Sequence, residues 1–237
     1  MARREGGIAG ILPAGVAVAD WVGGGDPPPP LPAEAALVAG ASPGRRRDLA
    51  VSRTCARQAL AQLGLPPAPV LRGPDREPAW PGGVVGSLTH CAGYGAAAVA
   101  PAARFAAVGI DAEVRRPLPG GVLAKIALPP ERAWIGARPA GCCWDRVLFS
   151  AKESVFKAWF PLTGAWLEFR DALVTFEPAA GTFSARLLVP GPLVDGRRVE
   201  VLAGRYAVAN GLVVTAIALE RRAEPAMFAI ANIAGSV

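Results

Sequence analysis

Two carboxylates close an apolar segment of the chain, in the run Val108-Gly109-Ile110-Asp111-Ala112-Glu113. We expect a strand from Phe105 to Glu113, and side chains two positions apart on a strand point to the same face. Asp111 and Glu113 therefore lie on one side, where two like charges repel unless a cation or a proton lies between them. An ordinary exposed strand end has the same pattern, so the pair alone leaves both interpretations open.

A second charged pair lies on an expected helix from Asp145 to Phe160, along which apolar residues recur at spacings of three and four. Glu153 and Lys157 are four positions apart and share one face of this helix. Such pairs are common on exposed helices, where they add only about 0.3–0.5 kcal/mol. However, Lys152 and Lys157 are two of only three lysines in the chain. Lysine is a compact charge suited to binding phosphate.

Taken together, Asp111, Glu113 and Glu153 supply three carboxylates. This hard, oxygen-only set is typical of a Mg²⁺ site completed by water and the phosphates of a substrate. The chemistry it indicates is displacement at a phosphate or pyrophosphate. The only histidine, His90, ends an expected strand that begins at Val84. It is either a surface residue or a phosphate ligand, since no second histidine is present to share a metal.

The bulk composition excludes several classes of protein. Hydrophobic residues make up 52% and charged residues 19% of the 237 residues, which indicates a globular chain. A net charge of +6 suits an anionic partner, but no basic run with interleaved aromatic residues indicates nucleic-acid binding. The sequence has no apolar run of membrane-spanning length. The N-terminal Met1 to Gly7 leads into no signal peptide, so we expect a cytoplasmic protein.

The cysteines indicate neither a disulfide framework nor a zinc site, because they form no C-x-x-C pair. Two of them, Cys142 and Cys143, are adjacent, and we expect them to be buried by packing.

The expected elements alternate between helix and strand in both halves of the chain. A short helix begins at Pro32, a longer one runs from Arg45 to Leu63, residues 72–83 form a loop, and Leu123 to Ile135 is helical but interrupted by two prolines. Short strands follow Trp166, with an Asn-Gly hairpin turn at Asn210. No internal repeat is visible. We therefore predict an α+β protein with an N-terminal lobe of residues 1–104 and a C-terminal lobe of residues 105–237.

Three motifs, in this order and spacing, resemble those of the Sfp-type 4'-phosphopantetheinyl transferases. The likeness is strongest to the branch that contains siderophore-synthetase activators and actinobacterial enzymes. The motifs are the run from Trp80 to Tyr94, which contains Gly86-Ser87-Leu88-Thr89-His90, the run from Val108 to Glu113, and the run Phe149-Ser150-Ala151-Lys152-Glu153-Ser154-Val155-Phe156-Lys157-Ala158-Trp159. The likeness covers roughly residues 30 to 220, and the three motifs in register are far more specific than any one of them.

The resemblance implies two α+β lobes related by a pseudo-twofold axis, with coenzyme A in the cleft between them. It implies transfer of 4'-phosphopantetheine to a carrier-protein serine with release of 3',5'-ADP, dependent on Mg²⁺ or Mn²⁺. It makes Asp111, Glu113 and Glu153 the metal ligands, Glu153 the base, and Lys157 the group that stabilises the leaving 3',5'-ADP. It also implies contacts to coenzyme A from Arg45, Arg53, Arg72, Thr89, His90, Asp111, Lys152 and Lys157.

Lys152 is expected at the pyrophosphate, and Glu131 is a further candidate acid or base. The chain departs from the family pattern at Asp75, where relatives often carry a basic residue, and at Gly95, where they often carry arginine. The implied partners are coenzyme A and acyl or peptidyl carrier domains of fatty-acid, polyketide, siderophore or other peptide synthases, with the enzyme acting as a monomer. The alternative function is a coenzyme-A-binding protein without transferase activity.

Overall fold

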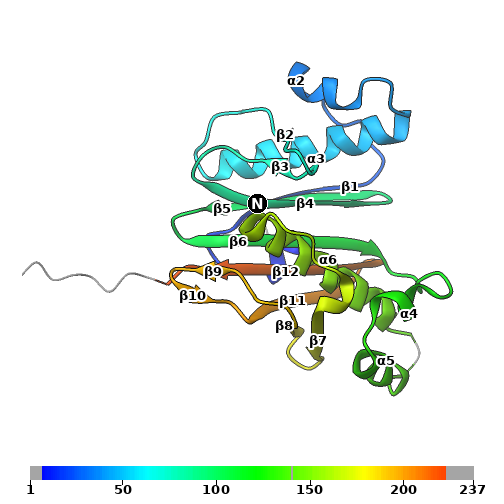
Figure 1. The fold of residues 1–237 in the computed structure, drawn as a ribbon. Helices are drawn as coiled ribbons and strands as arrows, with labels where there is room; N and C mark the ends of the chain where they lie inside the picture. The colour runs from blue at the N-terminus through cyan, green and yellow to red at the C-terminus, as the bar shows by residue number, and fades with distance from the viewer. Residues whose placement is uncertain (1–6, 140, 223–237) are drawn as a thin grey trace, which may run out of the picture.

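A computed structural model describes residues 7–139 and 141–222, and its mixture of helices and antiparallel sheets confirms the predicted α+β class. Each half of the chain contributes one main sheet and one long helix (Figure 1). The expected absence of a signal peptide concerned Met1 to Gly7, of which Met1 to Gly6 lie outside the described residues. Within the described ranges, no helix is long and apolar enough to cross a membrane.

The first sheet has three antiparallel strands, ordered β1 (Ala17–Val22), β5 (Tyr94–Pro101) and β4 (Val84–Cys91). Helix α3 (Pro43–Gln62) packs on it through a face that includes Cys55, Ala59 and Leu60, all fully buried. The alanines of β5 and Gly95 let the helix approach closely, because a Cβ at Gly95 would run into the side chain of Val51. The helix predicted from Arg45 to Leu63 is confirmed within two residues at each end.

The second sheet has five antiparallel strands and follows Phe105 in the chain. Its order is β6 (Phe105–Val114), β12 (Leu212–Glu220), β11 (Val201–Ala209), β8 (Thr182–Leu187) and β7 (Ala172–Glu177). Helix α6 (Trp144–Thr163) covers one face, continuing through Pro161 and ending at Gly164 in the left-handed conformation that favours glycine. The predicted Asn210-Gly211 turn does join β11 to β12, with both residues at positive φ.

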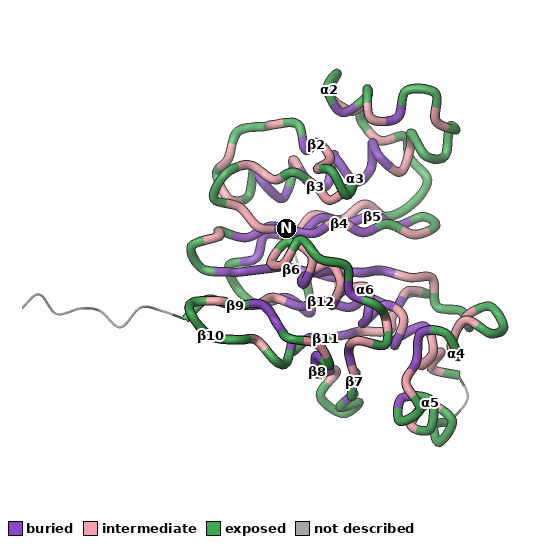
Figure 2. The backbone as a smooth tube through the Cα atoms, in the orientation of Figure 1, coloured by how far each residue is buried: buried purple, intermediate pink, exposed green. Residues whose placement is uncertain are grey.

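Strands β4 and β6 lie side by side where the two sheets meet, and side-chain hydroxyls connect them. The amide of Ile110 donates to Ser87 Oγ at 3.1 Å, and the amide of Ala112 donates to Thr89 Oγ1 at 2.9 Å. A second core packs against this seam and contains residues of β5, β6, β12 and the short helix α1 (Ile8–Ile11). Figure 2 shows the buried backbone concentrated in these central strands.

The remaining elements are short. They are α2 (Pro32–Ala35), η1 (Ala36–Val38), β2 (Leu71–Arg72), β3 (Pro78–Ala79), α4 (Val122–Ile126), α5 (Pro129–Gly136), η2 (Phe169–Asp171), β9 (Leu193–Val194) and β10 (Arg197–Arg198).

The predicted interruption of the helical segment from Leu123 to Ile135 is confirmed, because Pro129 opens a second helix at its first position. Two other sequence predictions need correction. The expected loop at 72–83 contains the small β2–β3 pair. Cys142 and Cys143 are only half-buried, because they lie in the turn before α6 and not within a packed element.

Candidate active site

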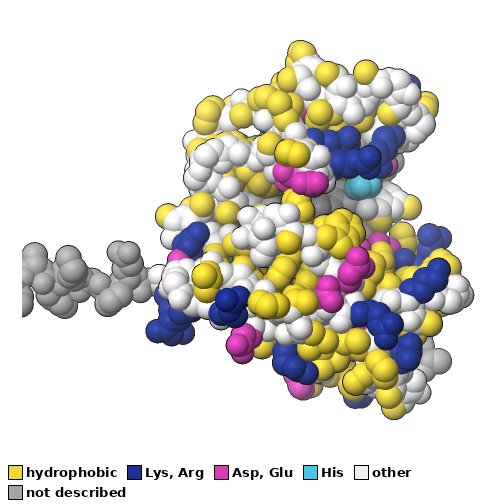
Figure 3. Space-filling view, viewed as in Figure 1, with side chains coloured by type: hydrophobic (Ala, Val, Ile, Leu, Met, Phe, Trp, Pro, Cys, Tyr) yellow, Lys and Arg dark blue, Asp and Glu magenta, His cyan; other side chains and the backbone are white. Residues whose placement is uncertain are grey.

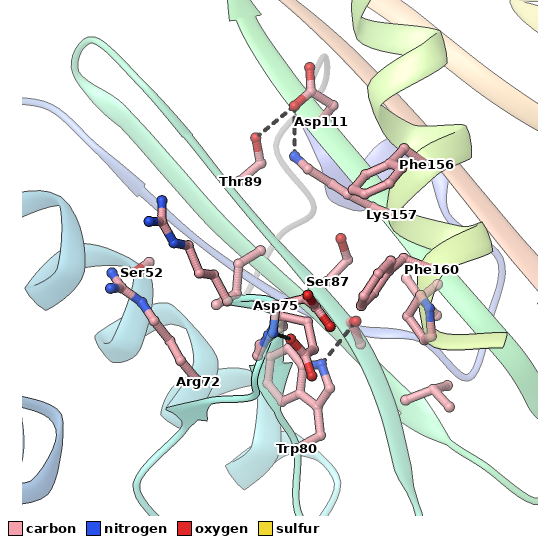
Figure 4. A pocket seen from close by; sticks show the side chains of 18 of the residues that line it. Ser52, Arg72, Asp75, Trp80, Ser87, Thr89, Asp111, Phe156, Lys157 and Phe160 are labelled. Carbon is pink, nitrogen blue, oxygen red and sulfur yellow. Dashed lines mark hydrogen bonds and ion pairs between the residues drawn. The ribbon is translucent and has the colours of Figure 1, made fainter. Parts of the chain in front are cut away.

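A cavity of about 800 Å³ lies between the first sheet with α3 and the end of α6. Its walls come from both halves of the chain, as the side chains labelled in Figure 4 show. In Figure 3, basic side chains and the single histidine gather along this hollow. The cavity therefore presents cations to whatever it binds.

Asp111 lies at one end of the cavity, on β6, and is 5% exposed. Its Oδ1 accepts a hydrogen bond from Lys157 Nζ at 2.8 Å and from Thr89 Oγ1 at 3.4 Å. Its Oδ2 is buried and has no hydrogen-bond partner in the described part of the chain. A buried carboxylate oxygen without a partner is costly, so this atom is suited to a ligand that the protein itself does not supply.

Glu113, two residues further along β6, is held by the buried guanidinium of Arg146 at 2.9 Å. Arg146 is itself fixed by the carbonyl oxygens of Arg116 and Pro117. Burial raises the pKa of Glu113, and the charge of Asp111 raises it further, while Arg146 opposes both. As predicted, the two carboxylates are close enough to interact.

Glu153 on α6 completes the group of carboxylates. Burial raises the pKa of Glu153, Lys157 opposes that change, and the charges of Asp111 and Glu113 add to it. The three acids are therefore electrostatic neighbours. Among residues 7–139 and 141–222, however, no three acidic, cysteine or histidine side chains converge closely enough to hold a metal in this conformation. Lys157 and Arg146 neutralise two of the acids instead.

Basic residues line the other end of the cavity. Arg45, Arg53, Arg72 and His90 all contribute to its wall. Thr89 also lines the cavity, on the side where it contacts Asp111. Arg53 is only 5% exposed, and its Nε has no hydrogen-bond partner among the described residues. Burial lowers the pKa of Arg53 to about 10, with Glu34 opposing that change and Arg72 adding to it. Arg53 is thus still a cation at neutral pH, and it is turned toward a site that favours an anion.

Comparison with known proteins agrees with this geometry. Residues 33–100 match the model of the 4'-phosphopantetheinyl transferase N-terminal domain, and residues 107–210 match that of the 4'-phosphopantetheinyl transferase superfamily. The chain is 58% identical to the 4'-phosphopantetheinyl transferase Svp of Streptomyces mobaraensis over 80% of its length and 78% of the relative's. It is 49% identical to PptT of Mycobacterium tuberculosis (90% and 97%) and 48% identical to Npt of Nocardia iowensis (89% and 99%). The chain belongs to the 4'-phosphopantetheinyl transferases.

The structure of this transferase does not bring Lys152 to the cavity. Its side chain is 2% exposed, and Nζ contacts Glu131 Oε1 at 2.9 Å and the carbonyl oxygens of Phe169 and Ala172 at 2.6 and 2.8 Å. All three donors of the ammonium are therefore used within the protein. Neither the predicted contact of Lys152 with the pyrophosphate nor the acid-base role of Glu131 is supported.

Several residues of the site were not identified from the sequence. Trp80, Phe156, Phe160 and Trp166 form an apolar part of the cavity wall. Trp166 is 70% exposed, and its ring centroid lies 4.7 Å from that of Phe156. Asp75, where the chain departs from the family pattern, and its neighbour Arg76 also line the cavity. The sequence shows that Phe156 and Phe160 are four positions apart on a helix, but this spacing is as typical of a face buried in the core as of the wall of a cavity.

Proposed function

We propose that this transferase moves the 4'-phosphopantetheine arm of coenzyme A onto a serine of acyl or peptidyl carrier proteins and releases 3',5'-ADP. The observation that carries the proposal is a cavity whose wall contains both arginines and the Asp111–Lys157 pair, with Arg72 away from that pair in Figure 4. Such a cavity suits a long ligand with phosphates along its length.

The basic end suits the adenosine and its 3'-phosphate. Arg45, Arg53 and Arg72 supply guanidinium groups, which bind phosphate through paired, charge-assisted hydrogen bonds. His90 lies 3.8 Å from Asp48 and also lines the cavity.

The three carboxylates, of which Asp111 lines the cavity, suit a divalent cation. Asp111, Glu113 and Glu153 would hold Mg²⁺ or Mn²⁺, and the unpartnered Asp111 Oδ2 and the all-oxygen donor set fit such an ion. When bound, the ion supplies charge neutralisation at the pyrophosphate. Lys157 contacts only Oδ1 of Asp111, so Oδ2 is open to the ion. The three carboxylates must come closer together than in this conformation to share it.

Glu153 is the group we assign as base. A carboxylate whose pKa is raised by burial is a better proton acceptor than an ordinary one. It takes the proton of the carrier serine while the serine oxygen bonds to the β-phosphorus of coenzyme A. The bond from that phosphorus to the leaving oxygen of 3',5'-ADP breaks in the same displacement. Lys157, a cation at the same end of the cavity, balances the charge on the leaving group.

Coenzyme A and carrier proteins as substrates also support a cytoplasmic enzyme without nucleic-acid partners. Both ends of the cavity come from one chain, which supports a monomer as the active form. Light scattering of the active fraction tests this, with a stable dimer as the contrary result.

The test of the function is intact-mass spectrometry of apo carrier proteins from fatty-acid, polyketide and peptide synthases, incubated with the enzyme, coenzyme A and Mg²⁺. We expect a gain of one phosphopantetheine that a chelator abolishes. Glu153→Gln should lose roughly 10²–10³-fold in rate, whereas the control Glu177→Gln, on the exposed face of β7, should not. Tight binding of coenzyme A without transfer to any carrier would indicate the non-catalytic binder instead.

A further inference from the structure

Helix α6 is fixed to the rest of its lobe by a buried ion pair outside the cavity. Glu131, at the third position of α5, has a side chain only 1% exposed. Its Oε2 accepts from the amide of Leu128, and its Oε1 accepts from the amide of Val174 and from Lys152 of α6. One carboxylate thus connects α5, β7 and α6.

Helix α3 is fixed in the same way in the other half of the chain. Glu34, at the third position of α2, is fully buried. Its Oε2 accepts from the amide of Leu31 at 2.9 Å and from Arg57 of α3 at 2.6 Å, and its Oε1 accepts from the amide of Val70 at 3.0 Å. This carboxylate connects α2, α3 and the segment before β2.

The two arrangements correspond group for group. Each begins with a Leu-Pro-x-Glu sequence, Leu31 to Glu34 and Leu128 to Glu131, that opens a short helix. Each carboxylate accepts a hydrogen bond from the backbone amide three residues before it. It accepts a second from an amide that lies just before or within a strand, and it pairs with a cationic side chain of a 20-residue helix. A four-residue pattern is too short to indicate a repeat in the sequence, and only the shared contacts of the two carboxylates reveal it. The two pairs lie near α2 and α5, at opposite ends of the molecule in Figure 1.

Each pair lies close, along its helix, to residues that line the cavity or belong to the acidic group. Lys152 directly precedes Glu153 on α6, and Lys157 follows Glu153 by about one turn. Arg57 follows Arg53 by one turn of α3. We propose that Glu131–Lys152 positions Glu153 and Lys157 for the displacement, and that Glu34–Arg57 positions Arg53 for coenzyme A. Neither pair touches the substrate, and the assignment rests on the function proposed above.

The physical reason is the rigidity of a buried carboxylate with fixed partners: Glu131 holds the buried Lys152, and Glu34 holds the 15% exposed Arg57. A helix packed only through small apolar side chains can slide or rotate slightly at low cost. A buried cation with fixed acceptors opposes that motion, because any shift leaves polar atoms unpaired. Displacement of a reacting group by about 1 Å can cost on the order of 10²-fold in rate, so such positioning has a measurable effect.

The test replaces both members of each pair, since a lone buried charge would unfold the protein for reasons unrelated to positioning. We expect Glu131→Gln/Lys152→Met to lower kcat by roughly tenfold or more with little change in KM for coenzyme A. We expect Glu34→Gln/Arg57→Met to raise that KM by roughly tenfold with little change in kcat. Each pair serves as the matched control of the other, at a temperature where circular dichroism shows both variants folded.

Two results would overturn the proposal, because they indicate a role in stability alone. One is a lowered melting temperature with kcat and KM unchanged, and the other is the same change of kcat and KM in both double variants. If a double variant does not fold, Lys152→Arg and Arg57→Lys keep the charge, alter the geometry and should give the same split. Calorimetric binding of coenzyme A separates this proposal from the function itself. We expect only the α3 variants to bind coenzyme A more weakly, and this expectation holds even if the enzyme modifies no carrier protein.

Discussion

The contact between β6 and α6 at Gly109 offers a sharp test of how the site is assembled. Gly109 lies two residues before Asp111, and α6 carries Glu153 and Lys157. A Cβ at position 109 would overlap the carbonyl oxygen of Ser154 and would lie 2.8 Å from the amide nitrogen of Ala158. Both obstacles are backbone atoms of α6, so no side-chain rotation can relieve the clash.

The size of the effect follows from these contacts. Non-bonded heavy atoms are normally about 3.5–4.0 Å apart, so Gly109→Ala must push α6 away from β6 by roughly 1–2 Å to clear both backbone atoms. Overpacking of this kind typically costs about 1–3 kcal/mol of unfolding free energy. The same shift separates Asp111 from Lys157, now joined at 2.8 Å. We expect kcat to fall on the order of 10²-fold.

The assay combines urea unfolding with steady-state transfer to a carrier protein, using Gly136→Ala as the control. Gly136 ends α5, and an added Cβ there would meet no atom within 4 Å. The control should be as stable as the parent or slightly more so. A Gly109→Ala enzyme with the parent's unfolding midpoint and kcat would show that β6 and α6 do not meet as described.

Three further changes test other parts of the molecule. Thr89→Val leaves the Ala112 amide unpaired and should lower the unfolding free energy by about 1–3 kcal/mol, whereas Thr89→Ser should change it much less; urea titration measures both. Arg53→Met should raise KM for coenzyme A by about 10–100-fold with kcat nearly unchanged, and unchanged binding by calorimetry would contradict that role. Burial raises the pKa of Cys55 to about 12, so the folded protein keeps this proton where the unfolded chain loses it. The contribution of this thiol to the free energy of unfolding therefore falls as pH rises from 9 toward 12, by at most about 1.4 kcal/mol per pH unit. Denaturation at pH 8 and 10 should show a smaller loss of unfolding free energy for Cys55→Ala than for the parent.

The sequence by itself determined the chemistry of the site and much of the local structure. The same-face direction of Asp111 and Glu113 follows from strand geometry alone. The shared face of Glu153 and Lys157 follows equally from helix geometry. Strong periodicity and proline positions located α3 and α6 within a few residues.

Periodicity was less informative where the composition was uniform. The alanine-rich composition of the segment that forms β5 is compatible with helix or strand, because alanine marks no face of either. Only pairing with β1 and β4 made it the centre of the first sheet.

The tertiary structure alone decided which partner each charge meets. Lys152 and Lys157 lie on one helix and looked equally suited to phosphate, yet only Lys157 reaches the cavity. Lys152 faces α5, where Glu131 and two carbonyl oxygens use all its donors. Spacing fixes the direction of a side chain relative to its own element, but the partner comes from a segment brought close only by folding. The burial of that partner then determines whether a charge is held for structure or left for a ligand.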